Sequence, residues 1–326
     1  MTVAEVTGRQ HLTVVPLLPI SAVVIDVLRS AADVQPIDSW QGSTRPIPEA
    51  PRNGVWSDSC RLEDLAFLHR GFAEYAHLLD LDERWSARWT TSWRVGQGSP
   101  VVYPVRDLAE VDVSGSVPVR RFTWRTGQYH RPGLEYMVAT GRHHGFESFE
   151  EECLLLVADF AAGLHEALSQ PFRLRFHTGG KTVDHTPDYL LLTKTGPFLV
   201  DVRPADRIHP EDELKFAATF ETALAAGWRY GVVTGWRRHV WETVDAFSAG
   251  RRPLNNVLDM QNQLRKVAAH GPLPLRDLVN RCSIPAVARA HALHLLWHRE
   301  LGVDLSAPYG DGSLIRLALP TLDGEQ

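Results

Sequence analysis

Residues 185–208, HTPDYLLLTKTGPFLVDVRPADRI, decide the fold expected for this chain of 326 residues. Two apolar runs, Tyr189 to Thr193 and Phe198 to Val202, have the length and composition of buried strands. They are joined through Lys194-Thr195-Gly196-Pro197, a short segment rich in turn residues. The stretch therefore predicts a β-hairpin, and its charged residues carry the functional argument.

The register of this hairpin depends on its turn. A two-residue turn at Thr195-Gly196 would place Asp188 opposite Arg203. Because side chains alternate between the faces of a strand, Asp188, Asp201 and Arg203 would then share one sheet face. A slip of one residue would separate them. The structural alternatives are a strand-start residue at Asp188 and an exposed strand face at Asp201 and Arg203.

Helix and strand patterns alternate from residue 146 onward, which predicts the α/β class. The expected order is α-β-β-β-α-β: a helix over 148–168, a strand over 172–176, the hairpin, a helix over 211–226 and a strand over 228–233. This order differs from a doubly wound nucleotide-binding fold, and the sequence has no glycine-rich phosphate loop.

Two carboxylates on one sheet face provide the oxygen ligands that Mg²⁺ prefers, and such a metal also holds a phosphate. A third carboxylate from the helix before the hairpin would complete the ligand set. Its candidates are Glu147, Glu150, Glu151 and Glu152. Ser148-x-x-Glu151 is also a capping box, so a purely structural role for Glu151 stays open.

The segment from Phe146 to Ile208 resembles the TnsA-like endonuclease subunits of heteromeric transposases, members of the PD-(D/E)xK restriction-endonuclease-like superfamily. The resemblance rests on ESFEEECLLLVADF (147–160), SQPFRLRF (169–176), HTPDYLLL (185–192) and FLVDVRPADRI (198–208). It implies a restriction-endonuclease-like core, a mixed sheet flanked by helices. It extends more weakly toward the C-terminus and does not cover the first 100 residues.

The resemblance also implies roles for four residues. Asp188 and Asp201 correspond to metal ligands, and Glu151 corresponds to the helix glutamate that binds metal or orients water. The metal would be Mg²⁺, with Mn²⁺ as a substitute. Arg203 stands where the family has lysine, in a chain with only four lysines. Arginine can stabilise transition-state charge but cannot act as a neutral base, so the site either tolerates arginine or has lost or slowed cleavage.

The function implied by the resemblance is metal-dependent cleavage of phosphodiester bonds at the 5′ ends of a transposon. The implied partners are double-stranded DNA, a DDE-type transposase subunit and an AAA+ ATPase regulator that docks on the C-terminal region. Two alternatives remain open. One is a catalytically weak or inactive assembly subunit that bridges transposase, ATPase and DNA; the other is a standalone restriction or repair nuclease.

The C-terminal segment has the order helix, turn, helix, strand, turn, strand, which is typical of a winged helix. The expected helices span 275–282 and 286–301, and the expected strands span 303–305 and 314–317. The second helix has few cations, so protein docking is as plausible a role as DNA reading. The chain is thus divided into a variable region over 1–119, a nuclease domain over 120–252 and a winged-helix domain over 253–326.

Two patterns precede the nuclease segment. Apolar residues at helical spacing predict a helix from Arg61 to Leu81. Trp85, Trp89 and Trp93 follow at intervals of four, a stripe more often found in a core or an interface than on a base-stacking surface.

Charge is unevenly distributed. The net charge of −5 contains a segment of −7 over 146–227, between segments of +4 over 120–145 and +3 over 228–252. This pattern suits a metal site flanked by phosphate contacts, or else a solvated acidic surface. The best candidate for DNA contact is the basic aromatic run made of Arg120, Arg121, Phe122, Trp124, Arg125, Tyr129 and Arg131.

Histidines bear on metal binding, and the cysteines and one apolar stretch bear on the cellular compartment. His291, His294 and His298 could bind zinc from one helix face, although packing is the commoner role. His143-His144 could approach a phosphate or belong to a loop. Three dispersed cysteines without a CxxC pair argue against a disulfide framework. The apolar stretch Leu12 to Ile25 is too short to span a bilayer, so the expectation is a cytoplasmic protein without membrane contact.

Overall fold

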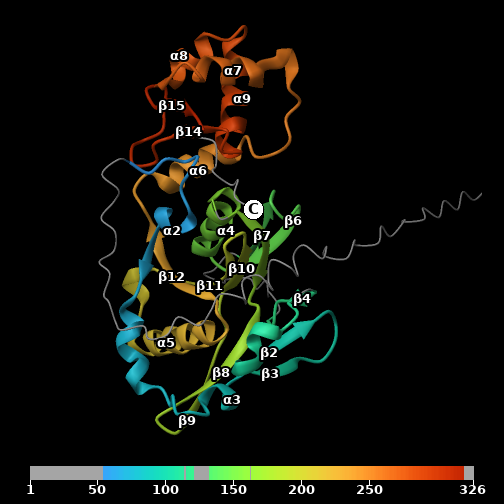
Figure 1. Ribbon diagram of the computed structural model, residues 1–326, viewed down its shortest axis with the longest axis vertical. Coiled ribbons are helices and arrows are strands. Elements are labelled where there is room, and N and C mark those ends of the chain that lie inside the picture. Colours follow the sequence, from blue (N-terminus) through green and yellow to red (C-terminus); the bar gives the residue numbers. More distant parts are fainter. Residues whose placement is uncertain (1–53, 114, 121–131, 162, 319–326) are drawn as a thin grey trace, which may run out of the picture. The chain divides into compact units, whose positions relative to one another are not determined.

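The computed structural model describes residues 54–113, 115–120, 132–161 and 163–318 (Figure 1). All described residues belong to one compact unit, within residues 36–326. This unit combines helices with several sheets, which confirms the α/β class. Within the described ranges, none of the helices has the length and apolar content needed to cross a membrane.

The first of two five-stranded sheets has the strand order β1-β12-β11-β10-β7. Its strands are β1 (Ala66–His69), β7 (Leu164–Ser169), β10 (Tyr189–Thr193), β11 (Gly196–Val202) and β12 (Arg229–Trp236). Strands β11 and β12 are parallel and the other pairs are antiparallel. The sheet is therefore mixed, because a helix crosses between β11 and β12 while a tight turn joins β10 to β11.

Helices α4 (Phe149–Ala161) and α5 (Pro210–Ala225) pack against this sheet (Figure 1). Successive residues of β10 enter different cores: Tyr189 packs with the α4 side chains, and Leu190 packs with those of α5. Because neighbouring side chains of a strand point to opposite faces, α4 and α5 cover opposite faces of the sheet. Strand β10 is buried along its whole length, which explains its uninterrupted apolar sequence.

The predicted element order holds for this sheet, but its first strand was misidentified. The helix predicted over 148–168 ends at Ala161, and Leu164–Ser169 forms β7. The strand predicted over 172–176 exists as β8 (Phe172–Thr178), yet it belongs to a second sheet. That sheet contains β2 (Thr90–Val95), β3 (Val101–Pro104), β4 (Ser116–Val117), β8 and β9 (Lys181–His185). The apolar residues of β7 also fit a helical stripe, so periodicity alone could not separate the two.

The hairpin turn also differs from the prediction. Thr193 pairs with Gly196, so the two turn residues are Lys194 and Thr195. The Thr193 hydroxyl donates to the Gly196 carbonyl at 2.7 Å and accepts from the Thr195 N–H at 3.3 Å. Gly196 has φ of +98°, which glycine adopts without strain. The register is displaced by two residues, an even number, so Asp188, Asp201 and Arg203 still share one face. Continuing the ladder, however, brings Asp201, rather than Arg203, opposite Asp188.

The helix predicted from Arg61 to Leu81 is wrong. This segment forms α2 (Leu62–Leu65), strand β1 and a 3₁₀ helix, η1 (Gly71–Leu78). Ala66–His69 pairs with β12 at the sheet edge, and this pairing overrides the local helical pattern. Trp89 and Trp93 are buried, as the core interpretation predicts, but Trp93 lies on β2 and not on a helix.

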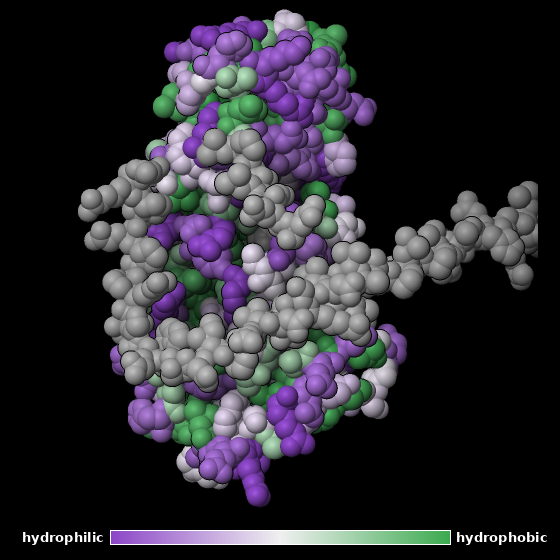
Figure 2. Space-filling model, viewed as in Figure 1, coloured by the Kyte–Doolittle hydropathy of each residue, from purple (hydrophilic) through white to green (hydrophobic). Residues whose placement is uncertain are grey.

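The C-terminal segment has the predicted order of elements. Its members are α7 (Met260–Ala268), β13 (Leu273–Pro274), α8 (Leu275–Asn280), α9 (Pro285–Trp297), β14 (Leu301–Val303) and β15 (Leu314–Leu317). The three strands form a small antiparallel sheet in the order β13-β15-β14. Hydrophilic side chains predominate over α7 and α8 on the face drawn in Figure 2. The last predicted helix ends at Trp297, four residues early, because β14 begins at Leu301.

Helix α9 is largely covered by its neighbours. It packs against α6 (Val240–Ser248), α7 and α8, and its residues from His291 to Trp297 are mostly buried. At Gly250 an added Cβ would lie 2.6 Å from the backbone nitrogen of His294, so the chain after α6 approaches α9 closely. The remaining elements are α3 (Trp85–Arg88), β5 (Gly133–Met137), β6 (Arg142–Phe146) and the 3₁₀ helices η2 (Val105–Glu110), η3 (Ala205–Arg207) and η4 (Val257–Asp259).

Candidate active site

Asp188 lies at the point where the backbone pairing of β10 and β11 stops. Its Oδ2 accepts a 2.7 Å hydrogen bond from the backbone N–H of Val202, so the side chain continues the ladder. Burial and the nearby charges of Asp201 and Glu151 raise the pKa of Asp188 well above its ordinary value. The structure therefore places Asp188 within electrostatic reach of both Asp201 and Glu151.

Asp201 is 2% exposed and lies on the α5 face of the sheet. Nε2 of His185 lies 3.1 Å from Oδ1 and 3.2 Å from Oδ2 of this carboxylate. The hydroxyl of Tyr230 donates to Oδ2 at 2.7 Å. The sequence analysis missed both partners; His185 stands in the quoted motif, whereas Tyr230 carries no sequence signal that connects it to Asp201.

Glu151 occupies the first turn of α4, and the predicted capping box is present in part: its backbone bond to Ser148 forms, but the reciprocal backbone donor is Glu147 rather than Ser148. The backbone N–H of Glu151 donates to Ser148 Oγ at 3.2 Å, and Glu151 Oε2 accepts from the N–H of Glu147 at 2.9 Å. The hydroxyl of Tyr189 lies 3.2 Å from the same Oε2. Burial raises the pKa of Glu151. The capping role and the position near Asp188 therefore coexist in one side chain.

The other glutamates of the first turn of α4 face different partners. Glu147 lies 3.7 Å from the guanidinium of Arg120, and Glu150 lies 3.9 Å from that of Arg207. Burial, together with the charges of Glu135 and Asp245, raises the pKa of Glu152. Glu151 is thus the member of the glutamate run whose charge acts on Asp188.

Arg203 is directed toward the start of α5. Its Nη2 donates to Asp212 Oδ2 at 3.3 Å, and its Nε donates to the carbonyl of Arg207 at 3.1 Å. Asp212 also lies 3.5 Å from the ammonium of Lys215 and caps α5 through the N–H of His209. The guanidinium that stands at the family's lysine position is therefore held by Asp212 rather than by Asp188 or Asp201.

The donor set fits a hard divalent cation. The described residues contain no group of three His, Cys, Asp or Glu side chains already arranged around a metal position. Mg²⁺, however, usually takes one or two carboxylates and completes its shell with water and substrate phosphate. Within the described ranges, the ion pairs include none between a lysine or arginine and Glu151, Asp188 or Asp201. A cation there would relieve the repulsion that raises the pKa of Asp188.

The basic aromatic run begins next to these carboxylates. The side chain of Arg120 is 51% exposed, and its charge lowers the pKa of Asp188 against the larger effect of burial. The remaining members of the run lie outside the described residues: Arg121, Phe122, Trp124, Arg125, Tyr129 and Arg131. Arg120 thus provides an exposed cation on the carboxylate side, as a phosphate contact requires.

The histidines of α9 have packing roles. His291 is 2% exposed, and Nδ1 of His294 lies 2.8 Å from the carbonyl of Gly250. The rings of His294 and His298 are 4.3 Å apart, an edge contact. These contacts favour the packing interpretation over zinc binding.

His143 and His144 belong to the hairpin of β5 and β6. His144 is buried, its Nε2 lies 2.7 Å from the hydroxyl of Thr140, and burial lowers its pKa. The ring of His143 packs against Tyr136. Both therefore belong to a strand rather than to a loop. Cys60, Cys153 and Cys282 are free and buried, as the absence of a disulfide pattern predicts.

Comparison with known proteins supplies no relative: no protein-family model matches the chain, and no curated protein matches it.

Proposed function

We propose that the protein is a Mg²⁺-dependent DNA endonuclease subunit of a heteromeric transposase, cleaving phosphodiester bonds at the 5′ ends of a transposon. The observation that carries the proposal is the meeting of Asp188, Asp201 and Glu151 at the end of the β10–β11 ladder. The order α4-β7-β10-β11-α5-β12 around them agrees with a restriction-endonuclease-like core. The motifs quoted for the resemblance contain all three residues.

In this proposal Asp188 and Asp201 hold the metal, and Glu151 is a third ligand or orients the attacking water. The metal supplies a water of lowered pKa and a contact that polarises the scissile phosphate. Arg203 offers a permanent positive charge for the developing phosphorane, but its guanidinium must first leave Asp212. Arg120 binds a neighbouring phosphate of double-stranded DNA.

The resemblance also supports the proposed partners. A DDE-type transposase would cut and join the 3′ ends, and an AAA+ ATPase regulator would dock on the C-terminal segment. The order of elements from α8 to β15 agrees with a winged helix. An enzyme acting on cellular DNA in this way would work in the cytoplasm.

The test is strand cleavage of a transposon-end duplex by the full chain together with its transposase in Mg²⁺. We expect Asp188→Asn and Asp201→Asn to abolish cleavage at the 5′ ends and leave 3′-end cleavage by the transposase intact. Asp184→Asn is the matched control, since it removes a partly exposed carboxylate on β9 that pairs with Arg175. Cleavage at the normal rate by Asp188→Asn would remove the mechanism.

A second candidate is a nuclease-fold assembly subunit without catalysis, bridging transposase, ATPase and DNA. One observation favours it: Arg203, at the position of the family's lysine, is bound to Asp212. Calorimetric titration separates the candidates. Mg²⁺ binding that disappears in Asp188→Asn supports the enzyme, and no heat of binding at millimolar Mg²⁺ supports the bridging subunit.

A further inference from the structure

Asp201 is the most deeply buried of the proposed ligands, and two other side chains hydrogen-bond its carboxylate. At 2% exposure its carboxylate depends on protein groups for hydrogen bonds. It accepts from the imidazole of His185 through both oxygens and from the phenol of Tyr230 through Oδ2. A carboxylate cannot donate when ionised, so Nε2 of His185 carries the proton in this contact.

The two donors come from strands that are distant in sequence. His185 ends β9 of the second sheet, and Tyr230 lies on β12, beside β11 in the first sheet. Nε2 of His185 and the hydroxyl of Tyr230 both bind the carboxylate of Asp201. The backbone pairing of their strands does not by itself require these contacts. Asp201 is therefore held from two directions while it remains on its own strand.

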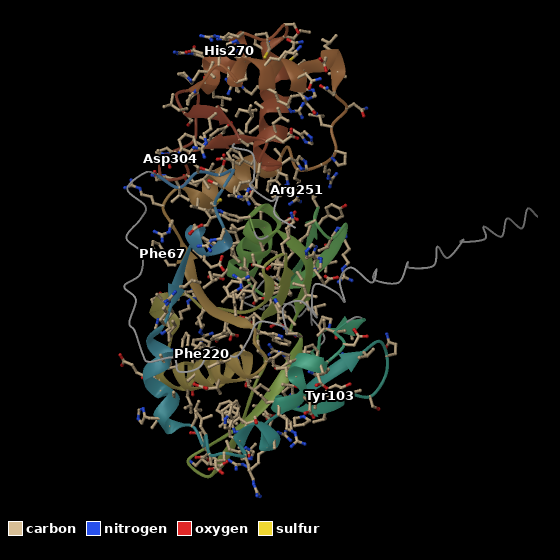
Figure 3. The ribbon with its side chains drawn as sticks, viewed as in Figure 1. Phe67, Tyr103, Phe220, Arg251, His270 and Asp304 are labelled. Atoms are coloured by element: carbon tan, nitrogen blue, oxygen red, sulfur yellow. The ribbon has the colours of Figure 1, made fainter. Side chains whose placement is uncertain are left out.

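Aromatic packing fixes both donors. The ring of Tyr230 contacts Phe72 with centroids 5.5 Å apart, and Phe72 contacts Phe220, which Figure 3 shows on α5. The ring of His185 packs edge-on against Phe216 at 6.3 Å. A donor that is already immobilised loses little entropy on holding its acceptor, so these contacts preorganise the carboxylate.

The bonds leave coordination capacity on Asp201. A carboxylate has about four acceptor positions, and one imidazole proton and one hydroxyl proton occupy only part of them. The charge of Asp201 raises the pKa of Asp188, so the carboxylate also acts on its neighbour across the ladder. A metal shared by the two carboxylates would not require Asp201 to lose either donor.

We propose that His185 and Tyr230 are positioning residues: they orient the Asp201 carboxylate so that it coordinates a divalent metal together with Asp188. The inference rests on the proposed function and adds two residues to it. Hydrogen-bond partners behind metal ligands are typically worth 10- to 100-fold in metal affinity. Neither residue contacts DNA or metal in this assignment; both act through Asp201.

The experiment is an electron paramagnetic resonance titration of Mn²⁺ with the full chain, comparing wild type with His185→Leu, His185→Gln and Tyr230→Phe. We expect His185→Leu and Tyr230→Phe to weaken Mn²⁺ binding about 10- to 100-fold. His185→Gln should restore most of the affinity, because its amide can donate to the carboxylate. Tyr103→Phe removes a hydroxyl from β3 of the second sheet (Figure 3) and should bind Mn²⁺ as wild type does.

Near-ultraviolet circular dichroism measures the fraction of molecules that is folded. The Mn²⁺ affinity is then expressed per folded molecule. The rescue by glutamine is a result that a purely structural role for His185 would not produce. Wild-type affinity in folded His185→Leu and Tyr230→Phe, together with loss in Asp188→Asn, would overturn the positioning role and leave the proposed function standing. Absence of Mn²⁺ binding in wild type would overturn both.

Discussion

The backbone N–H of Val202 donates a 2.7 Å hydrogen bond to Oδ2 of Asp188, so the carboxylate takes the place of a carbonyl where β10 begins. This bond ties the side chain to β11 and holds it beside Asp201. The bond favours the ionised form of Asp188, yet burial and two neighbouring carboxylates outweigh it. The arrangement of the site thus destabilises the ionised form of Asp188.

Asp188→Asn should stabilise the protein at neutral pH while removing its function. A carboxylate whose pKa is raised in the folded state destabilises that state once pH exceeds its unfolded pKa, and this penalty grows until pH passes the folded pKa. Asparagine removes the penalty. The melting temperature should rise by roughly 2–4 °C for each kcal/mol relieved, measured by calorimetry at pH 7. Near pH 3, where both forms are neutral, the difference should vanish; an equal difference at both pH values would contradict this origin.

Mg²⁺ should stabilise wild type and not Asp188→Asn. A ligand that binds only the folded state raises its stability by about 2.7 kcal/mol at a concentration of 100 times the dissociation constant. The measurement is the melting temperature over a Mg²⁺ series at constant ionic strength. Ca²⁺ and Na⁺ series control for general salt effects, and a rise of equal size in Asp188→Asn would place the metal elsewhere.

Glu151→Gln and Glu151→Ala should separate capping from metal chemistry. Glutamine can keep the side-chain bonds to Ser148 and to the N–H of Glu147, whereas alanine loses them at a cost of about 0.5–1.5 kcal/mol per bond. We therefore expect alanine alone to lower the urea midpoint, and both variants to lose cleavage. Glu150→Gln, which changes a neighbouring glutamate paired with Arg207, is the control. Normal cleavage by Glu151→Gln would restrict Glu151 to its structural role.

Arg203→Ala should lower cleavage by about 10²- to 10³-fold if its charge stabilises the transition state. Arg203→Lys should retain part of the rate, because lysine keeps the positive charge but lacks the planar arrangement of N–H donors of the guanidinium. Single-turnover cleavage measures the chemical step. An unchanged rate in Arg203→Ala would show that its bonds to Asp212 and the Arg207 carbonyl are its whole role.

Arg316→Ala should destabilise the C-terminal strands. Nη2 of Arg316 lies 2.9 and 3.0 Å from the two oxygens of Asp58, whose side chain is 1% exposed. Removing the guanidinium takes one ionic partner from the buried Asp58 carboxylate, and we expect a cost of more than about 1 kcal/mol. Urea unfolding measures the effect. Arg276→Ala, which breaks an exposed contact with Asp277, should cost at most about 1 kcal/mol.

Several elements could be predicted from sequence because short-range physics determines them. The β10–β11 hairpin, α5 and the α8–α9 turn have strong periodicity and clear ends, and the bond of Glu151 to Ser148 is contained within four residues. The prediction failed where distant pairing decided the outcome. Ala66–His69 forms a strand only because it pairs with β12, and Leu164–Ser169 forms β7 because it pairs with β10.

The candidate site divides along the same line. The sequence by itself determined which carboxylates are available; that Asp188 and Asp201 share a face followed from it only for an assumed turn. Only the tertiary structure decided that a turn at Lys194-Thr195 sets the two aspartates opposite each other, and that Arg203 binds Asp212. It alone brought His185 and Tyr230 to Asp201. The reason is physical: alternation along a strand is local, whereas the partners of a buried carboxylate come from strands whose pairing depends on the whole sheet.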